Sequence, residues 1–446
     1  MRRSIRDDLR VALGVSVRAG IGARAKRRAS KRQASRGIKA SGRTKASGRT
    51  KASGRPTATF TGLLAVLLCL NLIGLVMVLS ASSVTSQAEY GNPWYYVQRQ
   101  AMWSAVGAVV LLAVQRIDYH RWRPFTRIGL LGAIVLLALV LIPGVGLGAN
   151  GATRWIGYGP IGIQPSELAK LAVLVFVADL LGRRLHRMHE TRITLRPVLV
   201  VTAVVAGLIM MQPNLGTTLV IGAIVAAMLF VAGVPLGRLA VMASLGTALA
   251  TAAALAAPYR RARVFAFLDP WADPMNTGYQ TIQAWAALSE GGLSGVGVGA
   301  GRAKWGFLPF AHTDFIFAVV GEEFGLLGAT ALIGLFVLLG VLGVRTALRA
   351  PDPFGMLLAA GVTTWFIVQA FVNIGAVVGV LPITGVPLPF VSAGGSSLLA
   401  SMAAAGLLLN VARQSRESRP VESDASSRGG ADRAAVRTSP LVPAGR

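Results

Sequence analysis

The chain has 446 residues and a formal net charge of +27, yet only 14% of its residues are charged and 53% are hydrophobic. Soluble domains carry about a quarter charged residues, so this composition excludes an ordinary soluble globular protein. The single cysteine, Cys69, excludes a disulfide framework and a cysteine-based zinc site within one chain. Four scattered histidines also argue against a histidine-only metal cluster.

The positive charge is concentrated at the N-terminus, in residues 1–58. Positions 1–55 hold 18 of the 45 Lys and Arg residues and contain three copies of the pentapeptide KASGR. Low complexity and high charge predict disorder, so we expect a cytoplasmic arm that lies near anionic lipid headgroups. No specific nucleic-acid site is predicted, although partner or nucleic-acid binding is the alternative for such a segment. Residues 414–446 are expected to form a disordered cytoplasmic tail.

Residues 59–413 contain about ten apolar segments, each close to the roughly 20 residues that a helix needs to cross a bilayer. The predicted spans are 60–82, 98–115, 128–143, 167–182, 197–211, 216–234, 239–257, 316–344, 355–380 and 393–412. The sequence therefore predicts an all-α, polytopic membrane protein. A large loop, 258–315, separates spans seven and eight, and Tyr279 to Ser289 is expected to form a helix within it.

The distribution of Lys and Arg among the loops predicts the orientation of the chain. The loops after spans two, four, six and eight contain arginines, whereas the alternate loops are poor in Lys and Arg, apart from the long one. Short basic loops stay in the cytoplasm, and long loops count for little. Both termini are therefore predicted to be cytoplasmic. The extracytoplasmic loops are then 83–97, 144–166, 212–215, 258–315 and 381–392.

Asp314 lies where the long loop re-enters the membrane. A carboxylate at an apolar boundary has a raised pKa, which suits a general base. The alternative is an N-cap, in which Asp314 accepts amide hydrogens of the span that follows it. Glu322 and Glu323 come next, within the span itself, where ionisable groups are costly and usually paired or functional.

A second polar cluster contains Arg154, Glu167 and Lys170. Pro165 and Ser166 resemble a helix start with Ser166 as the N-cap, and Glu167 and Lys170 are three residues apart, so they can meet on one helical face. The pair could shape a polar cavity or only order the helix end.

Two segments are rich in glycine or proline. Residues 291–301 resemble a phosphate-binding loop but lack its Lys-Ser/Thr ending, so close backbone packing is the preferred explanation of the glycines. Residues 381–397 contain prolines and small residues that break and pack helices at membrane depth. Tight packing of the last span accounts for them, and a functional role stays open.

These clusters resemble the SEDS family, which includes FtsW, RodA and SpoVE. The resemblance runs from about residue 60 to 413 in the family's order. The matching strings are NGATRW at 150–155, QPSE at 164–167, QPNLGT at 212–217, GYQ at 278–280, HTDF at 312–315, GEE at 321–323 and PFVSAGGSS at 389–397. The chain departs from common family residues at Asn214, Thr384 and Ala393, which puts any role of those three positions in doubt.

The resemblance implies a ten-span peptidoglycan glycosyltransferase of the bacterial inner membrane that polymerises lipid II. The family's catalytic aspartate falls on Asp314 and its buried Glu/Lys pair on Glu167 and Lys170. Arg154, His312, Ser396 and Ser397, in matching strings, are the further substrate-binding candidates. Similarity nearer to FtsW than to RodA implies a septal role, with a class B penicillin-binding protein and other divisome proteins as partners.

Asp314 is expected to take a proton from the acceptor hydroxyl, while Arg154, Lys170 or a divalent cation steadies the diphosphate. No metal site built by the protein is predicted, so a cation such as Mg²⁺ or Mn²⁺ would bind with the substrate's phosphates. Two alternatives remain, a lipid II flippase and a division scaffold without chemistry. Polar residues gathered on one membrane face, and no detectable inverted repeat, favour the enzyme.

Overall fold

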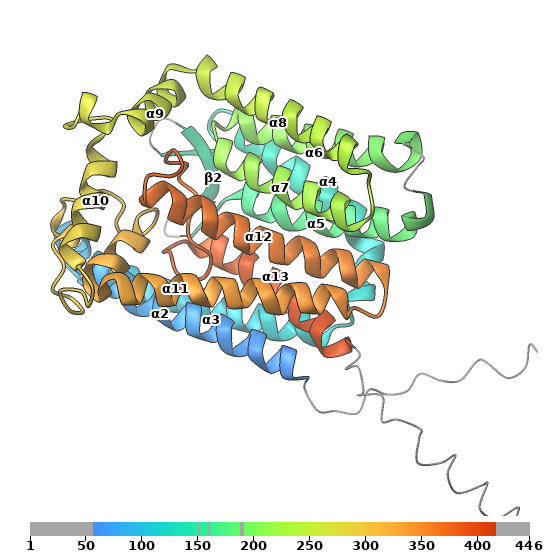
Figure 1. Ribbon diagram of the computed structural model, residues 1–446, viewed down its shortest axis with the longest axis horizontal. Helices are drawn as coiled ribbons and strands as arrows, with labels where there is room; N and C mark the ends of the chain where they lie inside the picture. The colour runs from blue at the N-terminus through green and yellow to red at the C-terminus, as the bar shows by residue number, and fades with distance from the viewer. Residues whose placement is uncertain (1–56, 150–151, 159–160, 188–190, 416–446) are drawn as a thin grey trace, which may run out of the picture. The chain divides into compact units, whose positions relative to one another are not determined.

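The computed structural model describes residues 57–149, 152–158, 161–187 and 191–415. The arm at 1–58 and the tail at 414–446 therefore lie almost wholly outside the described residues. The described part is dominated by ten long helices that run alternately in opposite directions (Figure 1). They are α2 Ala58–Tyr90, α3 Tyr95–Arg116, α4 Thr126–Val140, α5 Pro165–Arg183, α6 Arg196–Met211, α7 Leu215–Val231, α8 Leu236–Ala256, α11 Ile316–Leu348, α12 Pro353–Val377 and α13 Gly395–Gln414.

Each of the ten predicted spans corresponds to one of these helices, so the prediction of an all-α membrane fold is confirmed. Eight helical segments are long and apolar enough to cross a membrane by themselves. Of the other two, α7 is apolar but shorter, and α5 contains two acidic and two basic residues. The protein is an integral membrane protein. Helices α12 and α13 are buried along most of their length, whereas almost all of α8 is exposed.

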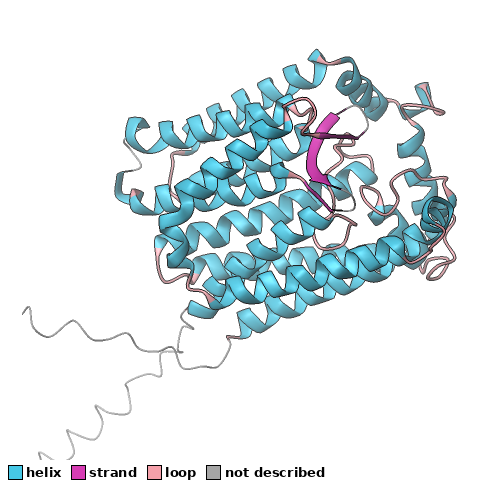
Figure 2. Cartoon of the chain, turned by 180° about the vertical axis from the view of Figure 1, so that it is seen from behind, coloured by secondary structure: helices cyan, strands magenta, loops and turns pink. Residues whose placement is uncertain are grey.

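A small antiparallel sheet lies at the end of the bundle where α5 begins (Figure 2). Its strands are β1 Leu147–Ala149, β2 Ala152–Tyr158 and β3 Ile161–Ile163, in the order β1-β2-β3. This segment was predicted only as part of a loop, because β1 and β3 have three residues each and β2 shows no regular alternation of apolar and polar side chains. The sheet matters for function because β2 carries Arg154.

The long loop folds into α9 Pro258–Leu268 and α10 Tyr279–Gly291, with short turns between them. The predicted helix from Tyr279 is therefore confirmed. After α10, the glycine-rich segment 291–301 packs into a break in α11, where Gly325 has φ +67°. Amides of Val296 and Gly297 donate to the carbonyls of Glu322 and Glu323 at 3.0 and 3.1 Å. These hydrogen bonds satisfy backbone groups that the break in α11 would otherwise leave unpaired.

The two acids in α11 have partners that brace this packing. Glu322 Oε1 accepts the amide of Arg302 at 2.5 Å, and Glu323 Oε1 accepts the Ser80 hydroxyl at 2.5 Å. A Cβ at Gly291 would lie 2.0 Å from the carbonyl oxygen of Gly321. Close backbone approach therefore explains Gly291, as the sequence predicted.

Replacing Gly291 by alanine is expected to destabilise the protein by about 1–3 kcal/mol, because the added methyl meets backbone rather than a movable side chain. Gly246→Ala on α8 is the matched control, since a Cβ there meets nothing within 4 Å, and alanine favours a helix. Thermal unfolding of both purified variants measures the difference. Equal melting temperatures would show that the backbone approach at Gly291 is not tight.

Candidate functional site

The candidate residues lie at the end of the bundle where α5, α11 and α13 begin and α12 ends. Asp314 belongs to a turn that immediately precedes α11. The N-cap of α11 is Phe315, without a side-chain cap, and within the described part of the chain the Asp314 carboxylate accepts no amide hydrogen bond. The N-cap alternative for Asp314 is therefore wrong. Its carbonyl oxygen instead accepts Nδ2 of Asn373, on α12, at 2.8 Å.

The electrostatic environment of Asp314 comes from two separate elements. Burial raises the pKa of the Asp314 carboxyl to about 6, while the nearby guanidinium groups of Arg263 and Arg154 act to lower it. Arg263 lies on α9 and Arg154 on β2. A carboxyl with this pKa is ionised at neutral pH and still basic enough to accept a proton.

His312 and Thr313 join the Asp314 turn to the segment between α12 and α13. The carbonyl of His312 accepts the amide of Ala393 at 2.9 Å, and the carbonyl of Thr313 accepts Oγ of Ser392 at 2.6 Å. The His312 ring lies 4.5 Å from that of Tyr96, and burial lowers the pKa of His312. Neutral His312 thus lies two residues from Asp314 without adding a positive charge.

The predicted pair of Glu167 and Lys170 is confirmed. Oε1 of Glu167 and Nζ of Lys170 are 2.9 Å apart, and both side chains are buried. Nζ also donates to Oε1 of Gln369 at 2.7 Å and lies 4.7 Å from the ring centre of Trp365. The ammonium group therefore has an anionic, a polar and an aromatic partner, which together offset its removal from water.

The predicted cap at the start of α5 is wrong. The N-cap is Gln164, the helix begins at Pro165, and Ser166 is already inside the first turn. Pro165 tolerates this first position because its missing amide hydrogen needs no partner there. Among the described residues the buried hydroxyl of Ser166 has no hydrogen-bond partner.

Two amides on α12 connect the ion pair to the Asp314 turn. Gln369, bonded to Lys170, also donates through Nε2 to the carbonyl of Pro387 at 2.8 Å. Asn373, one helical turn later, donates to the carbonyls of Val386 and Asp314 at 2.9 and 2.8 Å. Two amides four residues apart in an apolar span were a visible signal, but the sequence analysis did not single them out.

Arg154, Ser396 and Ser397 complete the predicted set. Arg154 donates to the carbonyls of Gln212 and Pro213, at 3.0 and 2.7 Å, in the turn before α7. Ser396 and Ser397 lie buried in the first turn of α13. Within the part of the chain that the structure describes, no hydrogen bond joins either serine to Asp314 or to the ion pair, and Ser396 Oγ has no partner.

Arg263 was missed by the sequence analysis, which counted the basic residues of 258–315 only as weak indicators of topology. The described residues hold no group of three His, Cys, Asp or Glu side chains suited to a metal ion. The arrangement thus consists of a carboxylate, two guanidinium groups and a neighbouring buried ion pair. It can accept a proton beside a site that favours anionic groups.

Comparisons with known proteins identify several relatives of this chain. A probable peptidoglycan glycosyltransferase FtsW of Geobacter metallireducens is 42% identical over 349 residues, which cover 78% of this chain and 93% of that protein. Stage V sporulation protein E of Bacillus subtilis is 40% identical over 354 residues, covering 79% of this chain and 97% of the relative.

Two solved structures are also similar. One, described as "Structural coordination of polymerization and crosslinking by a peptidoglycan synthase complex", has a TM-score of 0.65 and 34% identity, covering 79% of this chain and 97% of that chain. The rod shape determining protein RodA of Thermus thermophilus has a TM-score of 0.59 and 30% identity, covering 80% and 97%. The family model FTSW_RODA_SPOVE, described as a cell cycle protein, matches residues 61–417. The chain belongs to this family, as its motifs predicted.

Proposed function

We propose that this protein is a peptidoglycan glycosyltransferase that polymerises lipid II into glycan strands. The observation that carries the proposal is Asp314, a carboxyl with a pKa of about 6 that is flanked by Arg263 and Arg154. The names of the relatives support the same reaction: the Geobacter protein is called a probable peptidoglycan glycosyltransferase.

The proposed step is a single displacement with inversion. The 4-hydroxyl oxygen of a GlcNAc forms a bond to the anomeric carbon of a MurNAc, and the bond from that carbon to the diphosphate oxygen breaks. The hydroxyl proton passes to Asp314, and undecaprenyl diphosphate leaves with the bonding electron pair. Arg154 and Arg263 stabilise the charge that develops on the diphosphate.

A divalent cation, if bound, would be held mainly by the substrate's phosphates, since magnesium is commonly bound in that way. The septal role and the pairing with a class B penicillin-binding protein belong to the same proposal. Support comes from the FtsW name of the Geobacter relative and from the similar structure of a peptidoglycan synthase complex.

Purified protein with its transpeptidase partner should convert labelled lipid II into glycan that forms a ladder on a gel. Neither a flippase nor a scaffold makes such a ladder. The transpeptidase partner is also assayed alone as a control. It should make no glycan by itself, so that any glycan made by the two proteins together is attributed to this chain.

The rate of polymerisation should rise with pH through about 6, the pKa of Asp314. The base is active when ionised, so activity is present above this pH and is lost as the carboxyl becomes protonated below it. Arg263→Gln removes the nearby cation that favours the ionised form, so its profile should shift to higher pH. Rates of wild type and Arg263→Gln measured between pH 5 and 8 check this prediction. If the two pH profiles coincide, Arg263 does not affect the pKa of Asp314.

The proposed site must face the extracytoplasmic side, where lipid II is polymerised. Glu290 is exposed at the end of α10, so a cysteine introduced there, after Cys69→Ala, should react with an impermeant maleimide added outside intact spheroplasts. A cysteine at Arg349, the exposed C-cap of α11, should react only after the membrane is opened. The reverse pattern would place the site on the wrong side for this reaction.

A further inference from the structure

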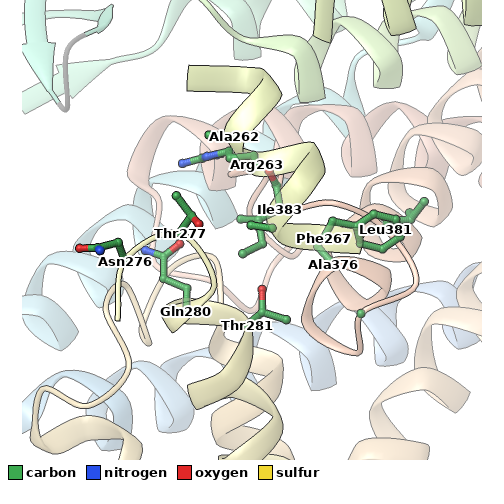
Figure 3. A pocket seen from close by; sticks show the side chains of 12 residues that line it. Ala262, Arg263, Phe267, Asn276, Thr277, Gln280, Thr281, Ala376, Leu381 and Ile383 are labelled. Carbon is green, nitrogen blue, oxygen red and sulfur yellow. Dashed lines mark hydrogen bonds between the residues drawn. The ribbon is translucent and has the colours of Figure 1, made fainter. Parts of the chain in front are cut away.

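A cavity of about 220 Å³ lies between α9, α10 and the segment that follows α12. Figure 3 shows Arg263 and Phe267 on α9, Gln280 and Thr281 on α10, and Ile383 and Leu381 on the third side. The motif GYQ, which contains Gln280, was singled out by its family resemblance but has no part in the chemistry described so far.

The cavity is next to the candidate base. Arg263, which lines the cavity, donates through Nη1 to the carbonyl of Ile383 at 3.3 Å. Two residues further along this segment, a Cβ on Gly385 would lie 3.6 Å from Oδ2 of Asp314. Two residues of extended chain span about 7 Å. The cavity and the carboxylate of Asp314 therefore lie within the reach of one substrate molecule.

Two polar side chains in the cavity wall have no hydrogen-bond partner among the described residues. Asn276 and Thr277 are hydrogen-bonded to Asp273. By contrast, neither the carboxamide of Gln280 nor the hydroxyl of Thr281 is hydrogen-bonded to any described residue, although the Thr281 residue is only 6% exposed. Neither of these two polar groups is sealed off from the cavity, so both can bind a ligand that donates and accepts hydrogen bonds.

The chemistry of the wall defines the ligand. Among the described residues that line the cavity only Arg263 is charged, and Phe267, Leu381 and Ile383 form an apolar side. A purely apolar polyprenyl chain would leave the polar groups unsatisfied. The volume is below the roughly 300–1,000 Å³ of sites for drug-sized ligands, so the cavity is too small to enclose a whole peptide stem. A sugar ring with an acetamide substituent has the required size, hydrogen-bonding groups and methyl group.

We propose that this cavity binds one N-acetylated sugar ring of the substrate, with Gln280 and Thr281 as specificity-determining residues that recognise its acetamide group. This proposal rests on the proposed polymerisation of lipid II. Either of the two rings of lipid II could supply the acetamide, and the experiment below distinguishes them.

The experiment compares lipid II with two analogues in which a neutral hydroxyl replaces the acetamide, on the GlcNAc ring in one and on the MurNAc ring in the other. Full-length protein with its transpeptidase partner is assayed for kcat/KM. Wild type should use one analogue about 10-fold less well, the cost of about one hydrogen bond left unsatisfied. Gln280→Leu should have a lower kcat/KM than wild type with natural lipid II, but it should use that analogue as well as it uses lipid II. The analogue that wild type uses poorly identifies the ring that the cavity binds.

Gln283→Leu is the matched control, because Gln283 lies one turn further along α10 and lines a different cavity. It should retain the discrimination of wild type. Thr281→Val, which keeps the shape of the side chain, is the second variant in case Gln280→Leu does not fold. If Gln280→Leu and Thr281→Val polymerise lipid II and discriminate as wild type does, the sugar site is wrong while the proposed function stands. If wild type makes no glycan at all, the proposed function itself has failed.

Discussion

The variant Asp314→Asn is expected to fold and to bind its partner, yet to polymerise lipid II about 10²–10⁴-fold more slowly than wild type, the usual contribution of a general base. Asparagine keeps the size of the side chain but cannot accept the proton. The main-chain carbonyl of residue 314, which Asn373 holds at 2.8 Å, is unchanged by the substitution. The turn should therefore keep its position.

The test measures initial rates of glycan formation together with the melting temperature of the purified variant. Asp269→Asn is the matched control, because Asp269 lies in the same long loop and caps a short turn through the amide of Trp271. Asparagine caps about as well as aspartate, so this control should retain near-normal activity. A normal rate for Asp314→Asn would remove Asp314 from the chemistry.

The second large effect concerns the buried ion pair. Glu167→Gln should destabilise the protein by about 3–5 kcal/mol, because it leaves the charge of Lys170 buried without its counter-ion. The double variant Glu167→Gln with Lys170→Met removes both charges and should recover much of that loss. Unfolding of the single and double variants in detergent measures the coupling between the two residues.

The exposed residues Glu290 and Arg302 provide the matched control, with Oε1 of Glu290 and Nη1 of Arg302 3.9 Å apart. Breaking such a surface pair with Glu290→Gln should change stability by less than about 1 kcal/mol. If Glu167→Gln were as mild as this control, the buried ion pair would contribute no more to stability than a surface pair does. Activity should fall together with stability, since Gln369 connects Lys170 to the segment beside Asp314.

Features encoded by neighbouring residues were predictable from the sequence. The ten spans follow from the length of the apolar segments, and the contact of Glu167 with Lys170 follows from their spacing on a helix. Close packing was predicted for Gly291, but the sequence did not indicate that the backbone of α11 is what it packs against. The start of α5 was misread because both Gln164 and Ser166 are polar residues next to Pro165, and only the backbone shows which one caps the helix.

Features that depend on contacts between distant segments were not predictable. Asn373 and Asp314 are 59 residues apart in the chain, and Arg263 lies in a loop whose charges indicated little about topology. Whether the Asp314 side chain caps α11 could be decided only once the first residue of α11 was known. The cavity beside Arg263 needed α9, α10 and residues 381–383 to be brought together.

We propose that the chain itself forms glycosidic bonds, with Asp314 as the base. The most direct measurement is the undecaprenyl diphosphate released by purified protein and partner, counted against the disaccharide units incorporated into glycan. We predict one diphosphate lipid released for each bond formed, with inverted configuration at the MurNAc anomeric carbon, and almost none with Asp314→Asn. Lipid II that crosses the bilayer of proteoliposomes intact, with no diphosphate lipid released, would contradict glycosidic bond formation by this chain and identify a flippase instead.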